Sequence, residues 1–252
     1  LIPNNLAWWV VNASDRTIIA HFLGTAANGI YSIANKFPNV FINFYNILNL
    51  SWTETVSLHY GDEDRDEFLT ETMTSLFKLF AAACFGIVAC MPFIFPILIN
   101  TKYDAAYNQI LILMYAMLFR VLVGLYSCVY VAQKNAKKIA YTSISAAIIN
   151  ITVDLILINK IQVFAASVST LVAFLSMFVI RYIDVNKTVH MKIRKPIIVG
   201  SVLIGGMLIG TYYCGNKIIQ FVALCITAIY AMLTNVDMLK SGVNLVKSRL
   251  GK

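Results

Sequence analysis

Polar side chains recur at helical spacing inside an apolar stretch near the start of the sequence. The intervals between them are three or four residues, so they share one face of a predicted helix over residues 27–52. The seven positions are Asn28, Ser32, Asn35, Asn39, Asn43, Asn46 and Asn49. An asparagine side chain both donates and accepts hydrogen bonds, as a ligand rich in hydroxyl groups requires. Packing between helices explains one or two asparagines, whereas seven polar positions in register favour a hydrated cavity.

Five ionisable residues also fall within apolar stretches: Asp15, Arg16, Lys36, Arg120 and Asp154. Each one costs roughly 2.5–3.5 kcal/mol at the centre of a bilayer, so these groups must face one another or water. Cationic donors in a cavity of low dielectric suit a phosphate group. We therefore predict a substrate cavity lined by cations and asparagines, namely Arg16, Lys36, Arg120, Asn12, Asn35, Asn39, Asn43 and Asn46. For Arg120, a structural role as partner of an aspartate is equally open.

The two carboxylates have two alternative roles. Asp15 and Asp154 either bind a coupling proton or cation, or they neutralise an arginine, and we favour neutralisation. Asp15 and Arg16 are adjacent, so their side chains point about 100° apart and need not pair with each other. Asp154 shares a predicted helix face with Ser143 and Asn150, which places polar groups beside it.

The elements that must position these residues are membrane-spanning helices. The sequence is 59% hydrophobic and 13% charged, against about 25% charged residues in an ordinary soluble domain. About 20 apolar residues cross a bilayer as a helix. Eight segments qualify or nearly qualify: residues 3–23, 27–52, 74–99, 106–132, 139–158, 163–184, 197–214 and 217–236. We predict an all-α, polytopic transmembrane helix bundle of about eight spans.

The distribution of basic residues orients this bundle. Lys and Arg are abundant in one set of alternate connections, which includes Arg65, Lys134, Arg181 and the segments 187–195 and 240–252. The other set holds only Lys102, Lys160 and Lys217. Cytoplasmic loops are the basic ones, so both ends of the chain are predicted to face the cytoplasm. This rule accounts for the net charge of +8 without a nucleic-acid partner.

The spans divide into two groups. Residues 1–184 form a predicted six-helix transport bundle, followed by a basic cytoplasmic loop, 185–196. Residues 197–236 form two accessory spans, because no ionisable residue other than Lys217 interrupts them, and 237–252 form a basic cytoplasmic tail. Gly206 and Gly210 make a G-x-x-x-G pattern, which indicates close helix packing.

Enzymatic sites find little support in the sequence. The three histidines lie far apart, and the sequence contains no H-E-x-x-H, G-x-S-x-G or P-loop pattern. The acidic run at residues 59–67 lacks the ligand spacing of a calcium loop and is predicted to be a solvated connection. We expect a protein that is not an enzyme and that has no metal or cofactor. The sequence starts at Leu1 without a signal peptide, so we expect a fragment of a longer protein.

Two stretches carry a resemblance to a known family. The first runs from Trp8 through Asp15-Arg16 and Phe22-Leu23-Gly24 to Gly29-Ile30-Tyr31-Ser32-Ile33-Ala34-Asn35-Lys36-Phe37-Pro38. The second is Ala132-Gln133-Lys134-Asn135-Ala136-Lys137-Lys138, followed by a span that contains Asn150. They resemble the C-terminal half of bacterial polysaccharide and O-antigen flippases, which belong to the multidrug, oligosaccharidyl-lipid and polysaccharide exporter superfamily. Between the fifth and sixth spans the sequence departs from that family, since Asn159–Phe164 lacks the expected Pro and Gly.

The resemblance implies a bacterial inner-membrane flippase for cell-surface polysaccharide, including the O-antigen of lipopolysaccharide. Such a protein moves a polyprenyl-pyrophosphate-linked oligosaccharide from the cytoplasmic to the outer leaflet by alternating access. The implied partners are this lipid-linked substrate, membrane lipids, an N-terminal half of the same transporter and polysaccharide polymerase or assembly proteins. Two alternatives remain open. A multidrug or cation antiporter of the same superfamily would place carboxylates on its cavity wall, and a membrane-embedded glycosyl- or acyltransferase would need catalytic acids or histidines.

Overall fold

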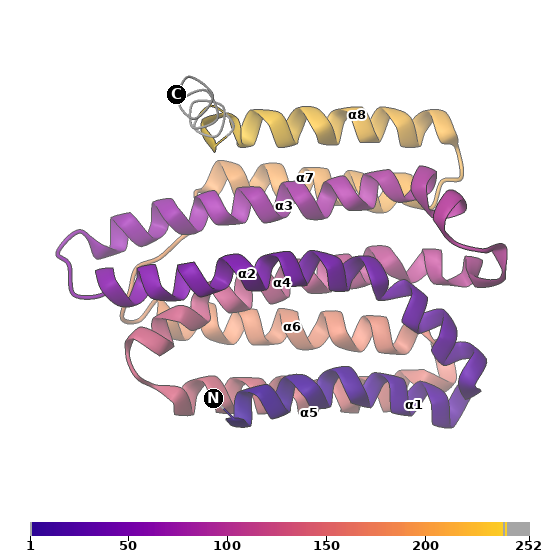
Figure 1. Ribbon diagram of the computed structural model, residues 1–252, viewed down its shortest axis with the longest axis horizontal. Helices are drawn as coiled ribbons and strands as arrows, with labels where there is room; N and C mark the ends of the chain where they lie inside the picture. The colour runs from indigo at the N-terminus through magenta and orange to yellow at the C-terminus, as the bar shows by residue number, and fades with distance from the viewer. Residues whose placement is uncertain (1, 239, 241–252) are drawn as a thin grey trace, which may run out of the picture.

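The computed structural model describes residues 2–238 and 240, with side chains described from residue 13 onward. Most of the predicted basic tail, 237–252, therefore lies outside the described residues. The described part is built of helices, as predicted, and Figure 1 shows them running roughly parallel to one long axis. They are α1 (Ile2–Ala34), α2 (Lys36–His59), α3 (Arg65–Leu98), the short 3₁₀ helix η1 (Thr101–Ala106), α4 (Tyr107–Ala132), α5 (Ala136–Ile161), α6 (Phe164–Val185), α7 (Lys195–Tyr212) and α8 (Lys217–Thr234).

The apolar composition of these helices confirms an all-α membrane bundle. Within the described residues, six helices are long and apolar enough to cross a bilayer: α3, α4 with η1, and α5 to α8. The first two predicted spans, 3–23 and 27–52, fall in α1 and α2, which are not among those six. In α2 the asparagine series lowers the mean hydropathy. The residues that suggest a cavity therefore also make this helix less apolar than an ordinary membrane span.

The chain bends sharply inside α1. Gly24 has φ 86° and ψ 175°, a conformation that strains any residue with a Cβ. Beyond Gly24, the chain rises obliquely from α1 toward α2 (Figure 1). A second irregularity lies at Asn35, between α1 and α2. Pro38 has no N–H to donate to the carbonyl of Ala34, so the helical hydrogen bonds are interrupted there.

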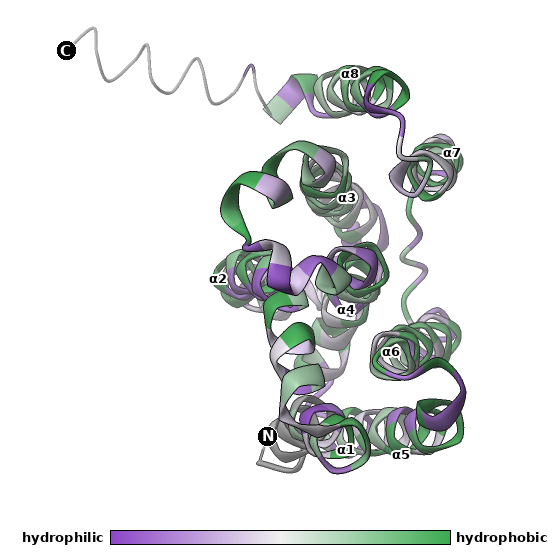
Figure 2. Ribbon diagram, turned by 90° about the vertical axis from the view of Figure 1, so that its right-hand side faces the viewer, coloured by the Kyte–Doolittle hydropathy of each residue, from purple (hydrophilic) through white to green (hydrophobic). Residues whose placement is uncertain are grey.

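Helix α4 lies at the centre of the bundle. It packs against α2, α3 and α6, while α5 packs against α1 and α6 (Figure 2). The indole of Trp52 donates to the Leu125 carbonyl at 3.1 Å, which ties α2 to α4. Close approach of these helices needs a glycine at position 124, because a Cβ there would overlap the Tyr45 ring.

The last two helices are peripheral. Helices α7 and α8 pack on α3 and on each other, away from α1 and α5 (Figure 2). The G-x-x-x-G pattern does not make the expected contact, since a Cβ on Gly206 or Gly210 would have no neighbour within 4 Å. Gly205 faces the core instead, next to Phe85 and Tyr115, because it lies about 100° around the helix from Gly206.

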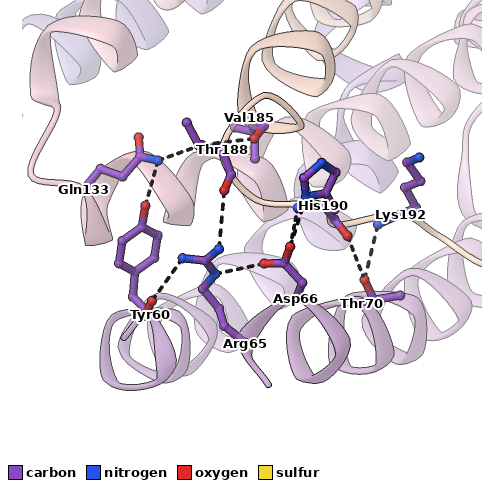
Figure 3. A network of polar contacts seen from close by, with 9 residues as sticks. All are labelled: Tyr60, Arg65, Asp66, Thr70, Gln133, Val185, Thr188, His190 and Lys192. Carbon is purple, nitrogen blue, oxygen red and sulfur yellow. Dashed lines mark hydrogen bonds and ion pairs between the residues drawn. The ribbon is translucent and has the colours of Figure 1, made fainter. Parts of the chain in front are cut away.

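The acidic run is not merely a solvated connection. Figure 3 shows that its end is docked on the segment between α6 and α7. Asp66 accepts from the backbone N–H of His190 at 2.9 Å, and Arg65 donates to the Thr188 carbonyl at 3.4 Å. In the next turn, Thr70 donates to the His190 carbonyl at 3.4 Å. These contacts fasten the predicted loop 185–196 to the start of α3.

The turn between α5 and α6 forms without the Pro and Gly that the resemblance leads one to expect between these spans. Gln162 adopts φ 51°, and its N–H donates to the Ile158 carbonyl at 3.0 Å, which closes the end of α5. A non-glycine residue therefore holds a left-handed conformation where glycine is usual.

Candidate functional site

A cavity of about 290 Å³ lies between α1, α2 and α4. Its volume approaches the lower end of the range for small-molecule sites. Polar and charged side chains form most of its lining: Asp15, Arg16, Tyr31, Asn35, Asn39, Asn43, Asn46 and Arg120, together with Ile42. Residues more than 100 positions apart in the sequence thus meet around one space.

The structure brings together most of the residues that the sequence analysis selected. Two of the three cations, four asparagines and one aspartate line this cavity. Lys36 is exposed at the start of α2 and is not part of the lining, and Asp154 is buried outside it. The side chain of Asn12 lies outside the described residues.

The asparagine series separates into two parts in three dimensions. Asn39, Asn43 and Asn46 are exposed and line the cavity, so their amide groups are available to a ligand. Asn49 is turned toward α4, where its Oδ1 accepts from the Cys128 thiol at 3.6 Å as well as from the Tyr45 hydroxyl of α2 at 2.6 Å. The Oδ1 atom of Asn28 is buried without a partner within the described part. Four of the seven predicted positions therefore share the cavity.

Asp15 connects the cavity to the interior of the bundle. Its carboxylate is 2% exposed, and Oδ2 accepts from the Tyr31 hydroxyl at 2.6 Å and from the Thr170 hydroxyl at 2.8 Å. Oδ1 has no hydrogen-bond partner among the described residues. The neighbouring Arg16 is exposed and lines the same cavity, but the two side chains form no ion pair, as the 100° separation allows.

Asp154 lies in the same interior region, between α1, α5 and α6. It is fully buried, and neither carboxylate oxygen has a hydrogen-bond partner in the part of the chain that the structure describes. It lies close enough to Asp15 for the two charges to interact. Nearby, Asn150 donates to Ser169 at 3.1 Å and accepts from Ser14 at 3.2 Å. We name Asp15, Asn150, Asp154 and Thr170 the acidic cluster.

Neither carboxylate of the acidic cluster forms an ion pair within the described residues, where the ion pairs involve loop and helix-end residues. A buried carboxylate without a cationic partner is unfavourable unless a proton or a cation accompanies it. The cluster offers two carboxylates and several neutral oxygens, a donor set that suits a hard cation or a proton. No group of three or more His, Cys, Asp or Glu side chains in the described chain is placed to hold a metal ion.

The sequence analysis missed one interior cation. It assigned Arg181 to a cytoplasmic connection, yet this side chain is 1% exposed and lies between α4, α5 and α6. Its Nε and Nη2 atoms donate to the Thr142 hydroxyl at 3.0 and 2.8 Å, and Nη2 also donates to Ser143 at 3.2 Å. Nη1 donates to Ser127 and to the Val123 carbonyl. The hydroxyl residues on α4 and α5, within about two helical turns of the basic segment 134–138, are the signal that could have revealed it.

A family model matches residues 1–156, which is more than half of the chain, and its name is MatE. The chain belongs to the MatE family. The MatE match covers α1 to α4 and most of α5, so it includes the helices that form the cavity and both aspartates of the acidic cluster, Asp15 and Asp154. MatE proteins belong to the exporter superfamily that the sequence resemblance indicates.

One solved structure shares the fold of this MatE chain. It is described as "Lipid II flippase MurJ, inward closed conformation", with a TM-score of 0.68 and 15% sequence identity. The alignment covers 94% of this chain and 53% of the MurJ chain, so the MatE chain spans about half the length of that protein. None of the curated proteins compared with the chain matches it.

Proposed function

We propose that this chain is the C-terminal half of a flippase that moves a polyprenyl-pyrophosphate-linked oligosaccharide across a bacterial inner membrane. The observation that carries the proposal is the cavity between α1, α2 and α4, in which two arginines stand beside four asparagines. The proposal places both chain ends in the cytoplasm, where the basic connections would be. MurJ, which shares the fold, is described as a lipid II flippase.

The cavity chemistry divides between the two parts of such a substrate. Guanidinium groups bind phosphate oxygens with paired, charge-assisted hydrogen bonds, and Arg16 and Arg120 would supply them to the pyrophosphate. Amide groups both donate and accept, so Asn35, Asn39 and Asn43 would bind sugar hydroxyls. Lys36, exposed near the start of α2, would contribute at most a more distant charge.

The cavity is open on one side, which agrees with a second half of the transporter that would cover it. Asn39, Asn43 and Asn46 are exposed in this chain, although an apolar environment would be costly for them. An N-terminal half packed opposite α1 and α2 would enclose these side chains around a central pathway. The coverage of 53% of the MurJ chain supports this arrangement of two halves. Polysaccharide polymerase or assembly proteins are further proposed partners.

A multidrug or cation antiporter is the alternative. Such a protein would carry a cationic substrate and would need uncompensated carboxylates on its cavity wall. Here one carboxylate, Asp15, lines the cavity, and Oδ2 of this group is occupied by two hydroxyl donors. Two arginines in the same lining would repel a cation. The electrostatics therefore favour an anionic substrate.

The acidic cluster supplies a site for the coupling ion. Sequence reasoning favours neutralisation of an arginine, but the described ion pairs include neither Asp15 nor Asp154. We therefore assign the coupling proton or cation to this cluster. Uptake of a positive charge would change the hydrogen bonds between Asp15 and Thr170, and hence the contact between α1 and α6.

The decisive experiment measures the leaflet distribution of lipid-linked oligosaccharide in cells that lack the full-length protein. The cells are complemented with wild type, Arg16→Ala or Lys36→Ala. We expect precursor to accumulate on the cytoplasmic side, wild type to clear it, and Arg16→Ala to lose at least about tenfold in rate, since one charged hydrogen bond contributes roughly 1.5–3 kcal/mol. Lys36→Ala is the matched control, because it removes a cation outside the cavity lining.

Two outcomes would contradict the proposal. If the distribution does not change on deletion, the substrate class is wrong and the antiporter becomes the leading function. If Arg16→Ala transports normally while present at wild-type levels in the membrane, the cavity is not the binding site for the pyrophosphate.

A further inference from the structure

A second cavity, of about 400 Å³, lies at the end of the bundle where α3 leads into η1 and α7 turns into α8. This is the right-hand end of the molecule in Figure 1. The end is opposite to the basic connections, and it is separate from the cavity between α1, α2 and α4. Its volume lies within the range of small-molecule sites. Among the residues that line it are Phe95, Asp104, Tyr107, Tyr212, Tyr213 and Gln220.

Aromatic rings form a rigid frame around this cavity. Tyr107 and Tyr212 stack with their centroids 4.3 Å apart and planes 10° from parallel. The Tyr212 hydroxyl donates to the Tyr107 carbonyl at 2.8 Å, and the Tyr107 hydroxyl donates to the Tyr212 carbonyl at 3.3 Å. Beside this stack, Tyr213 is 48% exposed and donates to the Asn108 carbonyl at 2.8 Å. The third ring is therefore fixed in position while part of its surface remains accessible.

A buried acceptor without a partner also lines the cavity. Gln220 is 5% exposed, and its Nε2 donates to the carbonyls of Thr211 and Tyr212 at 3.4 and 3.2 Å. Because carbonyl oxygens only accept, the amide nitrogen must face them, and the orientation of the amide is thereby fixed. Its Oε1 is left without a hydrogen-bond partner within the described residues. A buried acceptor of this kind is satisfied by a ligand that donates.

The charged residues that line the cavity give it no net charge. Asp104 and Lys217 are the two charged residues in its lining, and their charges are opposite. Lys217 Nζ donates to the Pro92 carbonyl at 2.6 Å. That carbonyl lacks its usual helical donor, because residue 96 is a proline without an N–H. The lining is thus neutral overall, with a fixed ammonium group that would repel an amine headgroup.

We propose that this cavity is a binding site for a neutral saccharide. Hydroxyl groups of the sugar donate to Gln220 Oε1 and to the Asp104 carboxylate, and an apolar sugar face packs on the exposed part of the Tyr213 ring. The inference rests on the proposed function in one respect, the source of the sugar. That source would be the transported glycan after it has crossed the membrane. Binding of a free saccharide to the cavity does not depend on transport.

The test measures saccharide binding to the full-length protein in lipid nanodiscs by saturation-transfer difference NMR and titration. Maltose, lactose and N,N′-diacetylchitobiose serve as separate probes. We expect at least one to bind, and Tyr213→Ala or Gln220→Met to raise its Kd by about three- to tenfold. Matched controls at the opposite end are Tyr141→Ala, which also removes an exposed tyrosine ring, and Gln133→Met, which also removes an Nε2 donor. Neither control should change the Kd.

The outcomes separate this inference from the proposed function. Absence of binding by all three probes overturns the inference. Loss of binding in Arg16→Ala with no change in Tyr213→Ala also overturns it, since the sugar then binds between α1, α2 and α4. If the leaflet assay fails but Tyr213→Ala still weakens saccharide binding, the proposed function is wrong and the saccharide site stands.

Discussion

Arg181 and Arg16 lie in two regions of the bundle that differ in burial and in the hydrogen-bond acceptors around the guanidinium. Arg181 is enclosed between α4, α5 and α6, where hydroxyl and carbonyl oxygens accept from its guanidinium. Arg16, on α1, is exposed and lines the cavity between α1, α2 and α4. The donors of Arg181 are hydrogen-bonded within the protein, whereas the Arg16 guanidinium is accessible from the cavity.

The difference shows how to distinguish a structural cation from a binding one in a membrane bundle. A buried charge is tolerated when hydrogen bonds satisfy it, and Thr142, Ser143 and Ser127 do so for Arg181. A guanidinium whose donors are already used has little left to offer a ligand. Of these two arginines, Arg16 therefore has the stronger claim to a role in transport and Arg181 to a role in holding α4, α5 and α6 together.

The largest expected effect is on stability. Arg181→Ala should lower the free energy of unfolding by about 2–5 kcal/mol, because it leaves a cavity and removes hydrogen bonds that join three helices. Arg16→Ala should change it by less than about 0.5 kcal/mol, as an exposed residue does. Thermal unfolding of the purified proteins in the same detergent measures both. Equal stability of the two variants would remove the distinction between the two regions.

A smaller effect tests which groups satisfy Arg181. Thr142→Val keeps the shape of the side chain but removes the hydroxyl that accepts from both Nε and Nη2. We expect a loss of about 1.5–3 kcal/mol, the range for a hydrogen bond to a charged group. Thr227→Val is the matched control, since Thr227 is also buried in a helix, 1% exposed against 9% for Thr142, and donates to the Ala223 carbonyl at 2.8 Å. A similar loss in both variants would show that the guanidinium does not depend on Thr142.

The two regions also differ in how far the sequence predicts them. Asn35, Asn39, Asn43 and Asn46 share the cavity, as their spacing predicts, because the helical repeat alone sets the face on which side chains lie. Lys36 misses this cavity since it is about 100° around the helix from Asn35. Periodicity thus identifies the face of one helix but not the residues that flank it.

Helical periodicity and hydropathy do not predict which residues of different helices make contact. Arg181 lies near the end of an apolar span, where the distribution of charge in loops gives it a cytoplasmic position, but hydroxyls on two other helices hold it inside. Likewise, Asp66 is part of an exposed acidic run in the sequence and binds the backbone of His190 in the fold. Both outcomes depend on which residues meet across long sequence separations, and hydropathy carries no such information.

The smallest effect sharpens the claim that neutral groups alone satisfy Arg181. Asp184 lies one turn further along α6 and pairs with Lys138 at 2.7 Å, and both side chains are partly exposed. It also accepts from the Tyr130 hydroxyl at 2.9 Å, an interaction that an asparagine oxygen would keep. Asp184→Asn should therefore cost no more than about 1 kcal/mol, the usual limit for a partly exposed ion pair, and this cost should fall as salt is added. A loss above about 2 kcal/mol that persists at high salt would mean that Asp184 also acts as the counter-ion of Arg181, and the contrast with Arg16 would then rest on charge pairing.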